Sequence, residues 1–164
     1  MSPEGSTVTF RRVPENLRRK LEQPLQSFAC TLENKVAAGS SFDCLVTTDA
    51  ELRRLNREFR GHDVATDVLS FPVGQALSPA NPSPRSLAPD PHLGDLAISL
   101  PRARAQALQF GHDLQDEIRI LMLHGLLHLL GMEHETDRGR MARAERRWRA
   151  RLCLPVGLIE RVAS

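Results

Sequence analysis

Three histidines stand close together late in the chain, at His124, His128 and His134. Residues four apart lie one turn above one another on a helix, so the first two can direct ring nitrogens to one point. Gly131 suits the left-handed conformation that ends a helix, and the reversal it permits would bring His134 back beside the pair. Three imidazoles around zinc leave a fourth position for a water whose pKa falls to roughly 7. The spacing therefore predicts a catalytic metal centre.

The stretch that would carry the first two histidines is apolar on nearly every side, as in a helix buried in a domain core. The alternative to a metal centre is a set of hydrogen-bonded core histidines, which is the usual explanation for a single histidine on such a helix. Three histidines at this spacing, with glycine at the turn, favour the metal.

Gly125 directly follows the first histidine, where zinc proteases with this helix-and-turn pattern carry a glutamate as general base. Because that carboxylate is missing, peptide hydrolysis by the same mechanism is disfavoured. Neutral histidines also leave the double positive charge of the metal uncompensated, which favours an anionic substrate.

Two further segments join the histidine run in a family resemblance. One comprises Asn56–Arg60 and Thr66–Pro72, and the other is Leu93–Ser99. In these residues the chain resembles the YbeY family of bacterial metal-dependent endoribonucleases, also called rRNA maturation factors. The resemblance covers roughly residues 40 to 152.

The resemblance implies that His124, His128 and His134 bind one metal ion per chain, usually zinc. It also implies that Arg60 and His124 act in RNA cleavage. The chain departs from the family at Met132-Glu133, where Tyr-Asp is common, and at Ala65, where proline is common. Glu133 keeps a carboxylate but adds a methylene, so a hydrogen bond from it to a metal ligand would be displaced.

Acidic residues near the motifs have two interpretations. Asp67 and Asp95 are candidates for orienting the ligands or ordering loops, as is Glu133. The alternative for the two aspartates is an ordinary place at a turn or a strand end.

Arginines offer an independent argument for an anionic substrate. A planar guanidinium such as that of Arg60 can bind two phosphate oxygens at once. The alternative is a solvent-facing cation at a helix C-terminus. Arg53 and Arg57 lie on the same expected helix and are candidates for RNA-backbone contacts. Since the chain has six phenylalanines, one tryptophan and no tyrosine, a platform of stacked bases is not expected.

Composition predicts one globular domain over residues 1–164, with 41% hydrophobic residues and a net charge of +2. No apolar stretch approaches the roughly 20 residues of a membrane span. The N-terminus lacks a secretory pattern, and the three cysteines are not in a paired spacing, so we expect a cytoplasmic protein with no membrane contact.

Hydrophobic periodicity predicts an α+β fold, a small mixed β-sheet packed with helices, and the resemblance adds a zincin-like layout. We expect strands over 7–13, 42–47, 67–71 and 93–100, and helices over 14–38, 50–60, 101–110, 113–130 and 137–152. Pro24 is expected to divide the first helix. The proline-rich segment 73–92 is expected to be a surface loop, a neutral insertion in preference to a substrate flap.

The resemblance implies a single-strand-specific, metal-dependent endoribonuclease that acts in late small-subunit (16S) rRNA maturation and ribosome quality control. Its expected partners are single-stranded RNA, rRNA, and the small ribosomal subunit with its proteins. A metal and Arg60 would stabilise the charge on the phosphate, while the nucleophile, water or the 2′-hydroxyl, stays open. The alternatives are a non-catalytic ribosome-assembly factor with a structural zinc and a metalloprotease.

Overall fold

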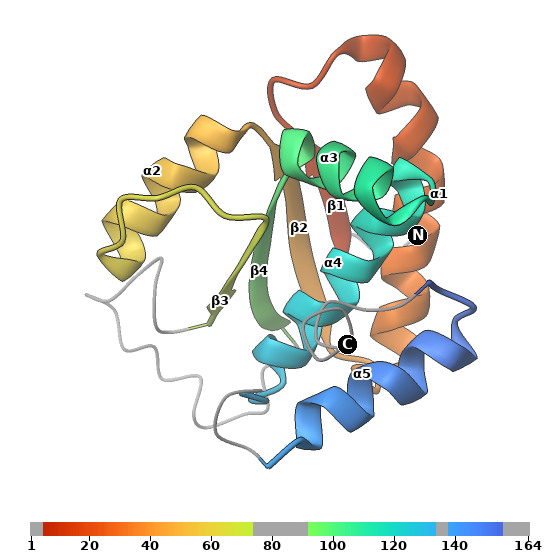
Figure 1. Ribbon diagram of the computed structural model, residues 1–164. Coiled ribbons are helices and arrows are strands. Elements are labelled where there is room, and N and C mark those ends of the chain that lie inside the picture. Colours follow the sequence, from red (N-terminus) through yellow and green to blue (C-terminus); the bar gives the residue numbers. More distant parts are fainter. Residues whose placement is uncertain (1–4, 74–91, 134–137, 156–164) are drawn as a thin grey trace.

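The computed structural model describes residues 5–73, 92–133 and 138–155, which form four strands and five helices in an α+β arrangement (Figure 1). The strands are β1 (Thr7–Phe10), β2 (Ser41–Thr47), β3 (Val68–Pro72) and β4 (His92–Ser99). The helices are α1 (Glu15–Lys35), α2 (Asp49–Arg60), α3 (Leu100–Phe110), α4 (Leu114–Leu129) and α5 (Arg140–Arg151). The expected small mixed sheet packed with helices is confirmed.

The strands form one sheet in the order β1-β2-β4-β3. β1, β2 and β4 run parallel, while β3 is antiparallel to β4 at one edge. Parallel neighbours need long crossovers, and α1 supplies the one between β1 and β2. The segment after β2 makes α2 and then the edge strand β3, which pairs with β4.

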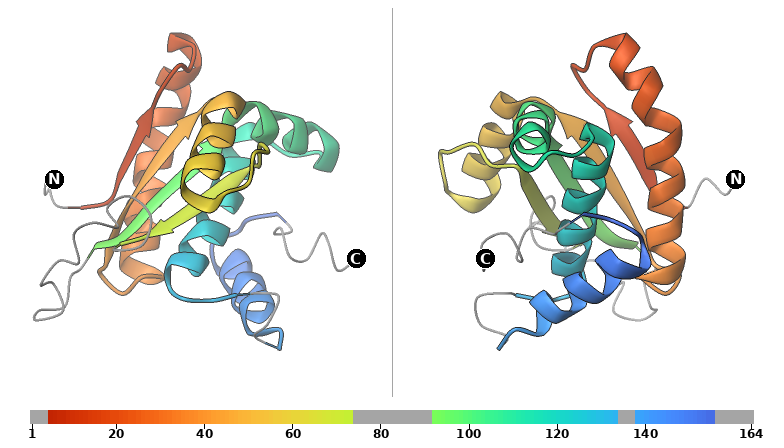
Figure 2. Two further views of the ribbon diagram at one scale, coloured as in Figure 1. Left: turned by 90° about the vertical axis from the view of Figure 1, so that its left-hand side faces the viewer. Right: turned by 45° about the vertical axis from the view of Figure 1, so that its right-hand side comes forward.

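Side chains alternate between the two faces of the sheet, so neighbouring residues of β4 enter different cores. Leu96 and Ile98 join a large core with α1 and α4. Ala97 packs in a smaller core with Phe71 of β3 and Leu52 of α2. Helix α2 therefore covers one face, and α1 and α4 cover the other (Figures 1 and 2).

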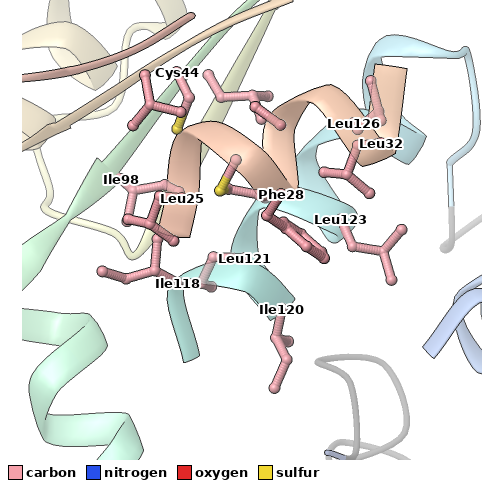
Figure 3. Close-up of a cluster of buried hydrophobic side chains, with 14 of the residues drawn as sticks. Leu25, Phe28, Leu32, Cys44, Ile98, Ile118, Ile120, Leu121, Leu123 and Leu126 are labelled. Carbon is pink, nitrogen blue, oxygen red and sulfur yellow. The ribbon is translucent and has the colours of Figure 1, made fainter. Parts of the chain in front are cut away.

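The large core forms where α1 and α4 meet on the sheet. Figure 3 shows leucine, isoleucine and phenylalanine side chains of the two helices interdigitating beside Cys44 and Ile98. Helix α4 is buried on nearly all sides, as its apolar sequence predicts. This burial fixes the helix that carries the first two histidines.

The expected break at Pro24 is wrong, because α1 runs unbroken through it. An internal proline removes one backbone hydrogen bond and crowds the preceding turn. The apolar stripe of α1 continues on both sides of the proline, with Leu21, Leu25 and Phe28 all buried. Tertiary packing thus overrides the local signal for a helix end.

Other element ends lie within a few residues of expectation. The first strand was expected to reach position 13 but ends at Phe10, and Arg12 has a φ of 57°, which an extended strand does not permit. Of the expected loop 73–92, residues 74–91 lie outside the described residues, and His92 already belongs to β4. Within the described ranges no helix has both the length and the hydrophobicity to cross a membrane.

Candidate functional site

A pocket of about 410 Å³ lies between the C-terminal half of α4, the end of α2 and strand β3. His124 and His128 line it from α4, Arg60 from α2, and Glu133 from the segment after α4. Asp67, the residue before β3, also lines it. The structure therefore brings together five of the residues that the sequence singled out.

The two histidines of the pocket lie one turn apart, with ring centroids 4.8 Å from each other. Nδ1 of His124 is 2.8 Å from Oε2 of Glu145, and Nδ1 of His128 is 2.9 Å from the carbonyl oxygen of Met132. A ring that donates its Nδ1 proton carries its lone pair at Nε2. Donation from Nδ1 to these oxygens would leave Nε2 as the atom through which each ring binds a metal.

Glu145 is a candidate site residue that the sequence analysis missed. It lies on α5, only 1% exposed, and contacts the almost fully buried His124. The signal was present, because Met141 and Ala144 form the buried stripe of α5 and Glu145 falls on that stripe. A lone carboxylate on an apolar helix face requires a partner, since a buried charge is costly unless it is paired.

The third expected ligand, His134, lies outside the described residues. The turn before it is described. Gly131 has a φ of 93°, and its N–H donates to the carbonyl of His128 at 2.9 Å. Met132 donates to the carbonyl of Leu127, so the chain reverses direction after α4.

Arg60 is placed by the way in which α2 ends. Gly61 adopts the left-handed conformation that closes the helix, and the buried Asn56 donates from Nδ2 to the carbonyl of Val64 at 3.0 Å. The Arg60 guanidinium donates to the carbonyl of Ser70 on β3 and lies 5.7 Å from the ring centroid of Phe71. These contacts hold a cation at the wall of the histidine pocket.

Gly125 marks a close approach between α4 and the sheet. A Cβ at this position would lie 2.7 Å from Cδ2 of Leu96 and 3.3 Å from Oγ of Ser70. The Ser70 hydroxyl donates to the Gly125 carbonyl at 3.0 Å. The glutamate that zinc proteases carry after the first histidine would therefore have no space here.

Two of the three acidic candidates lie at the histidine pocket, and the third lies elsewhere. Glu133 is exposed and lines the pocket. Asp67 lines it as well, and its carboxylate accepts hydrogen bonds from the N–H of Val68 and from Nε2 of Gln106. Asp95 is not brought to the pocket. It pairs in register with Phe71, whose side chain faces α2, so it lies on the sheet face opposite α4.

The environment of Asp95 is electrostatically unfavourable for a carboxylate. Partial burial raises the pKa of Asp95 above its ordinary value, and the neighbouring Asp43 raises that pKa further, while His92 acts in the opposite direction. Asp95 therefore belongs to a separate cluster. The ligand atoms of Asp43, His92 and Asp95 all lie within 4.8 Å of one another, a spacing that could hold a metal ion.

The arginines expected to contact RNA lie outside the pocket. Arg53 and Arg57 are exposed on α2 and line a neighbouring depression. Arg53 forms a bidentate ion pair with Asp63, with Nε 2.8 Å from Oδ1, and Nη1 of Arg57 is 3.8 Å from the same carboxylate. This pairing raises the pKa of Arg53 and lowers that of Asp63.

Comparison with known proteins assigns the chain to a family. The family model described as Endoribonuclease YbeY matches residues 7–152. A protein of Solibacter usitatus named Endoribonuclease YbeY is 61% identical over 163 residues, which cover 99% of both chains. One of the same name from Koribacter versatilis is 42% identical over 90% of this chain and 91% of its own.

A solved structure shares the fold. The solution structure of a Thermotoga maritima protein is 20% identical, with a TM-score of 0.50 over 87% of this chain and 85% of that one. The family match spans both the α4 histidines and Arg60, which line the same pocket. The chain belongs to the Endoribonuclease YbeY family.

Proposed function

We propose that this protein is a metal-dependent endoribonuclease that cuts single-stranded RNA in the pocket between α4, α2 and β3. One observation carries the proposal: the Arg60 guanidinium lines a single pocket with two histidines whose Nδ1 atoms face oxygen acceptors. A cation beside a pair of metal-ligand imidazoles fits a substrate with a phosphodiester group. The family to which the chain belongs supports the same reaction.

The residues present fit a zinc ion. His124 and His128 offer imidazole nitrogens, which are suitable zinc ligands. Their contacts to the Glu145 carboxylate and the Met132 carbonyl orient the two rings, as hydrogen-bond partners of metal-ligating histidines usually do. We propose His134 as the third ligand on the basis of its sequence position. When bound, the ion would act as a Lewis acid on a phosphoryl oxygen and lower the pKa of a water.

The proposed role of Arg60 is to bind the scissile phosphate and to stabilise its negative charge. Its guanidinium keeps its charge at any working pH and carries five N–H donors, of which one serves the Ser70 carbonyl. The donors turned to the pocket would bind the scissile phosphate and offset the negative charge that builds up in the transition state. Glu133, at the exposed rim, would take part in ordering the ligands or the substrate.

The proposed biological role is late maturation of small-subunit rRNA and ribosome quality control in the cytoplasm. The support for this step is the resemblance of the histidine, Asn56–Pro72 and Leu93–Ser99 segments to rRNA maturation factors. The proposed partners are accordingly rRNA and the small ribosomal subunit with its proteins. Exposed arginines of α2 would contact the phosphate backbone by exchanging their Asp63 partner for RNA.

The test is cleavage of a labelled single-stranded RNA by zinc-loaded protein. We expect Arg60→Ala to lower the rate on the order of 10²-fold or more, because a charge-stabilising donor is lost. His128→Ala should abolish cutting by removing a ligand. Arg104→Ala, an exposed arginine on α3, is the matched control and should cut like the wild type.

Equal cutting by all variants would mean a contaminating nuclease and would contradict the proposal. The ends of the products identify the nucleophile. Attack by water leaves a terminal phosphate monoester, whereas attack by the 2′-hydroxyl leaves a cyclic phosphate. Cutting of duplex RNA at the same rate would contradict the single-strand preference.

A metalloprotease is the weaker alternative, because the packing at Gly125 leaves no room for the general base of that mechanism. A peptidase assay with and without chelator tests it directly. The remaining alternative, a non-catalytic assembly factor with a structural metal, predicts intact protein that cuts no RNA, free or within ribosomal particles.

A further inference from the structure

A second group of metal-ligating side chains lies at the start of strands β2 and β4, on the sheet face that α2 covers. It consists of Asp43, His92 and Asp95. All three are partly accessible, and Asp43 and Asp95 also line a pocket of about 320 Å³. This group shares no residue with the histidine pocket, which lies on the α4 side of the sheet.

Backbone geometry brings the three residues together. Asp43 and Asp95 are Cα partners in the parallel pairing of β2 and β4. His92 is three residues before Asp95, so regular alternation would place it on the opposite face. Gly94, with a φ of 145°, and a register shift between Ser41 and Asp43 interrupt that alternation.

The pair of carboxylates is unfavourable without a cation. Like charges directly opposite each other on one sheet face destabilise it. The two arginines of the adjoining pocket, Arg11 and Arg54, pair with Glu51. The imidazole of His92 lies beside the pair, with Nε2 3.6 Å from Oδ2 of Asp43.

Neighbouring hydroxyls orient two of the three side chains. Thr7 donates to Oδ1 of Asp43 at 2.6 Å, and Ser41 Oγ lies 3.0 Å from Nδ1 of His92. These contacts turn Oδ2 of Asp43 and Nε2 of His92 toward one another. Two ligand atoms held about 2.1 Å from one tetrahedral ion are about 3.4 Å apart, close to the separation found here.

We propose that Asp43, His92 and Asp95 form a second metal site, which binds a divalent first-row transition ion and clamps β2 to β4. One imidazole and two carboxylates suit manganese or zinc. The two carboxylates neutralise the charge of the ion, and water completes its coordination from the adjoining pocket. Two of the three ligands, Asp43 and His92, are each held by a hydroxyl, as ligands of metal sites usually are by neighbouring polar groups.

The test uses full-length protein carrying His128→Ala, which removes a ligand of the proposed catalytic ion. Binding of Mn²⁺ is followed by the loss of the free-ion paramagnetic resonance signal. We expect one ion per chain, and at least tenfold weaker binding when Asp95→Asn is added. Asp63→Asn, which changes an exposed carboxylate outside the cluster, is the matched control and should leave the affinity unchanged.

A second measurement guards against a folding artefact. Mn²⁺ should raise the melting temperature of the His128→Ala protein and have no such effect once Asp95→Asn or His92→Gln is added. Circular dichroism should show the same fold in all variants. If the His128→Ala protein binds no Mn²⁺, or if both added substitutions leave its affinity intact, the site does not exist, whatever the outcome of the RNA assay.

Discussion

Glu145 makes a single buried contact that orients His124, a proposed metal ligand. Its carboxylate accepts from Nδ1 of His124 in a region where both side chains are nearly inaccessible. The contact fixes the tautomer and the ring orientation, and a carboxylate partner also increases the basicity of the opposite nitrogen. Glu145 is therefore a positioning residue for the proposed metal centre.

Glu145→Gln should weaken zinc binding by roughly 10- to 100-fold, because a neutral amide polarises the imidazole less than a carboxylate does. Competition with a chromogenic chelator measures this affinity. Glu58→Gln, a change at an exposed glutamate that pairs with Arg54 on α2, is the matched control. An unchanged affinity in Glu145→Gln would show that packing alone orients His124.

The packing between α4 and the sheet depends on a position without a side chain. The Gly125 backbone approaches Leu96 of β4 and accepts the hydroxyl of Ser70 from β3. This approach places the histidines of α4 against the strand that also holds Arg60. A side chain at this position would meet Leu96 of β4 first and press the helix away from the sheet.

Gly125→Ala should lower the free energy of unfolding. Overpacking of a core costs typically about 1–3 kcal/mol, which exceeds the roughly 1 kcal/mol that alanine gains over glycine in a helix. Urea unfolding measures the change. Leu96→Val removes both Cδ atoms that meet the new Cβ, so Gly125→Ala should cost less in that background. A simple stabilisation by Gly125→Ala in the wild type would contradict the close contact.

Helix α1 shows that an element can persist against a strong local signal. It contains Pro24 and remains continuous, because its buried residues on both sides of the proline pack into the large core. The proline costs the helix one backbone hydrogen bond and imposes crowding. A substitution that restores the hydrogen bond should therefore raise the free energy of unfolding.

Pro24→Ala should stabilise the protein by about 1–2 kcal/mol, since the recovered hydrogen bond exceeds the entropy that the unfolded chain regains. The midpoint of urea unfolding should rise accordingly. Gln23→Ala, at the exposed neighbouring position, is the control and should change stability by less than about 0.5 kcal/mol. A lower midpoint for Pro24→Ala would mean that α1 needs the proline bend.

At the scale of the whole molecule, the fold is held by apolar packing on both sides of the sheet. The larger core joins α1, α4, β2 and β4, and the smaller joins α2 to β3 and β4. The proposed catalytic pocket lies at the edge of this packing and contributes little of it. The fold should therefore not depend on a metal ion.

Chelation should abolish RNA cleavage while the far-ultraviolet circular dichroism spectrum stays unchanged. The melting temperature should fall only moderately, because losing an ion present at 100 to 1,000 times its Kd lowers the free energy of unfolding by about 3–4 kcal/mol. Readdition of zinc should restore cutting. Cooperative unfolding on chelation at room temperature would favour the structural-metal alternative.

The sequence by itself determined the helices and strands and the likeness to a family, because both depend on the spacing of residues close together in the chain. Strands and helices follow from periodicity. The start of α2 follows from its threonine cap, Thr48, and its end from Gly61. His124 and His128 share a helix face because of their separation alone. Arg60 entered the candidate site only through the family resemblance, since its own chemistry also fits a surface cation.

Only the tertiary structure decided which distant groups meet. Glu145 reaches His124 because α5 packs on α4, and Asp95 leaves the histidine pocket because strand register places it beside Phe71. His92 and Asp95 come together through the conformation of Gly94 and the register shift between β2 and β4. The physical reason is that local patterns set helix and strand faces, whereas register, helix packing and the burial of charges depend on contacts between segments far apart in the chain.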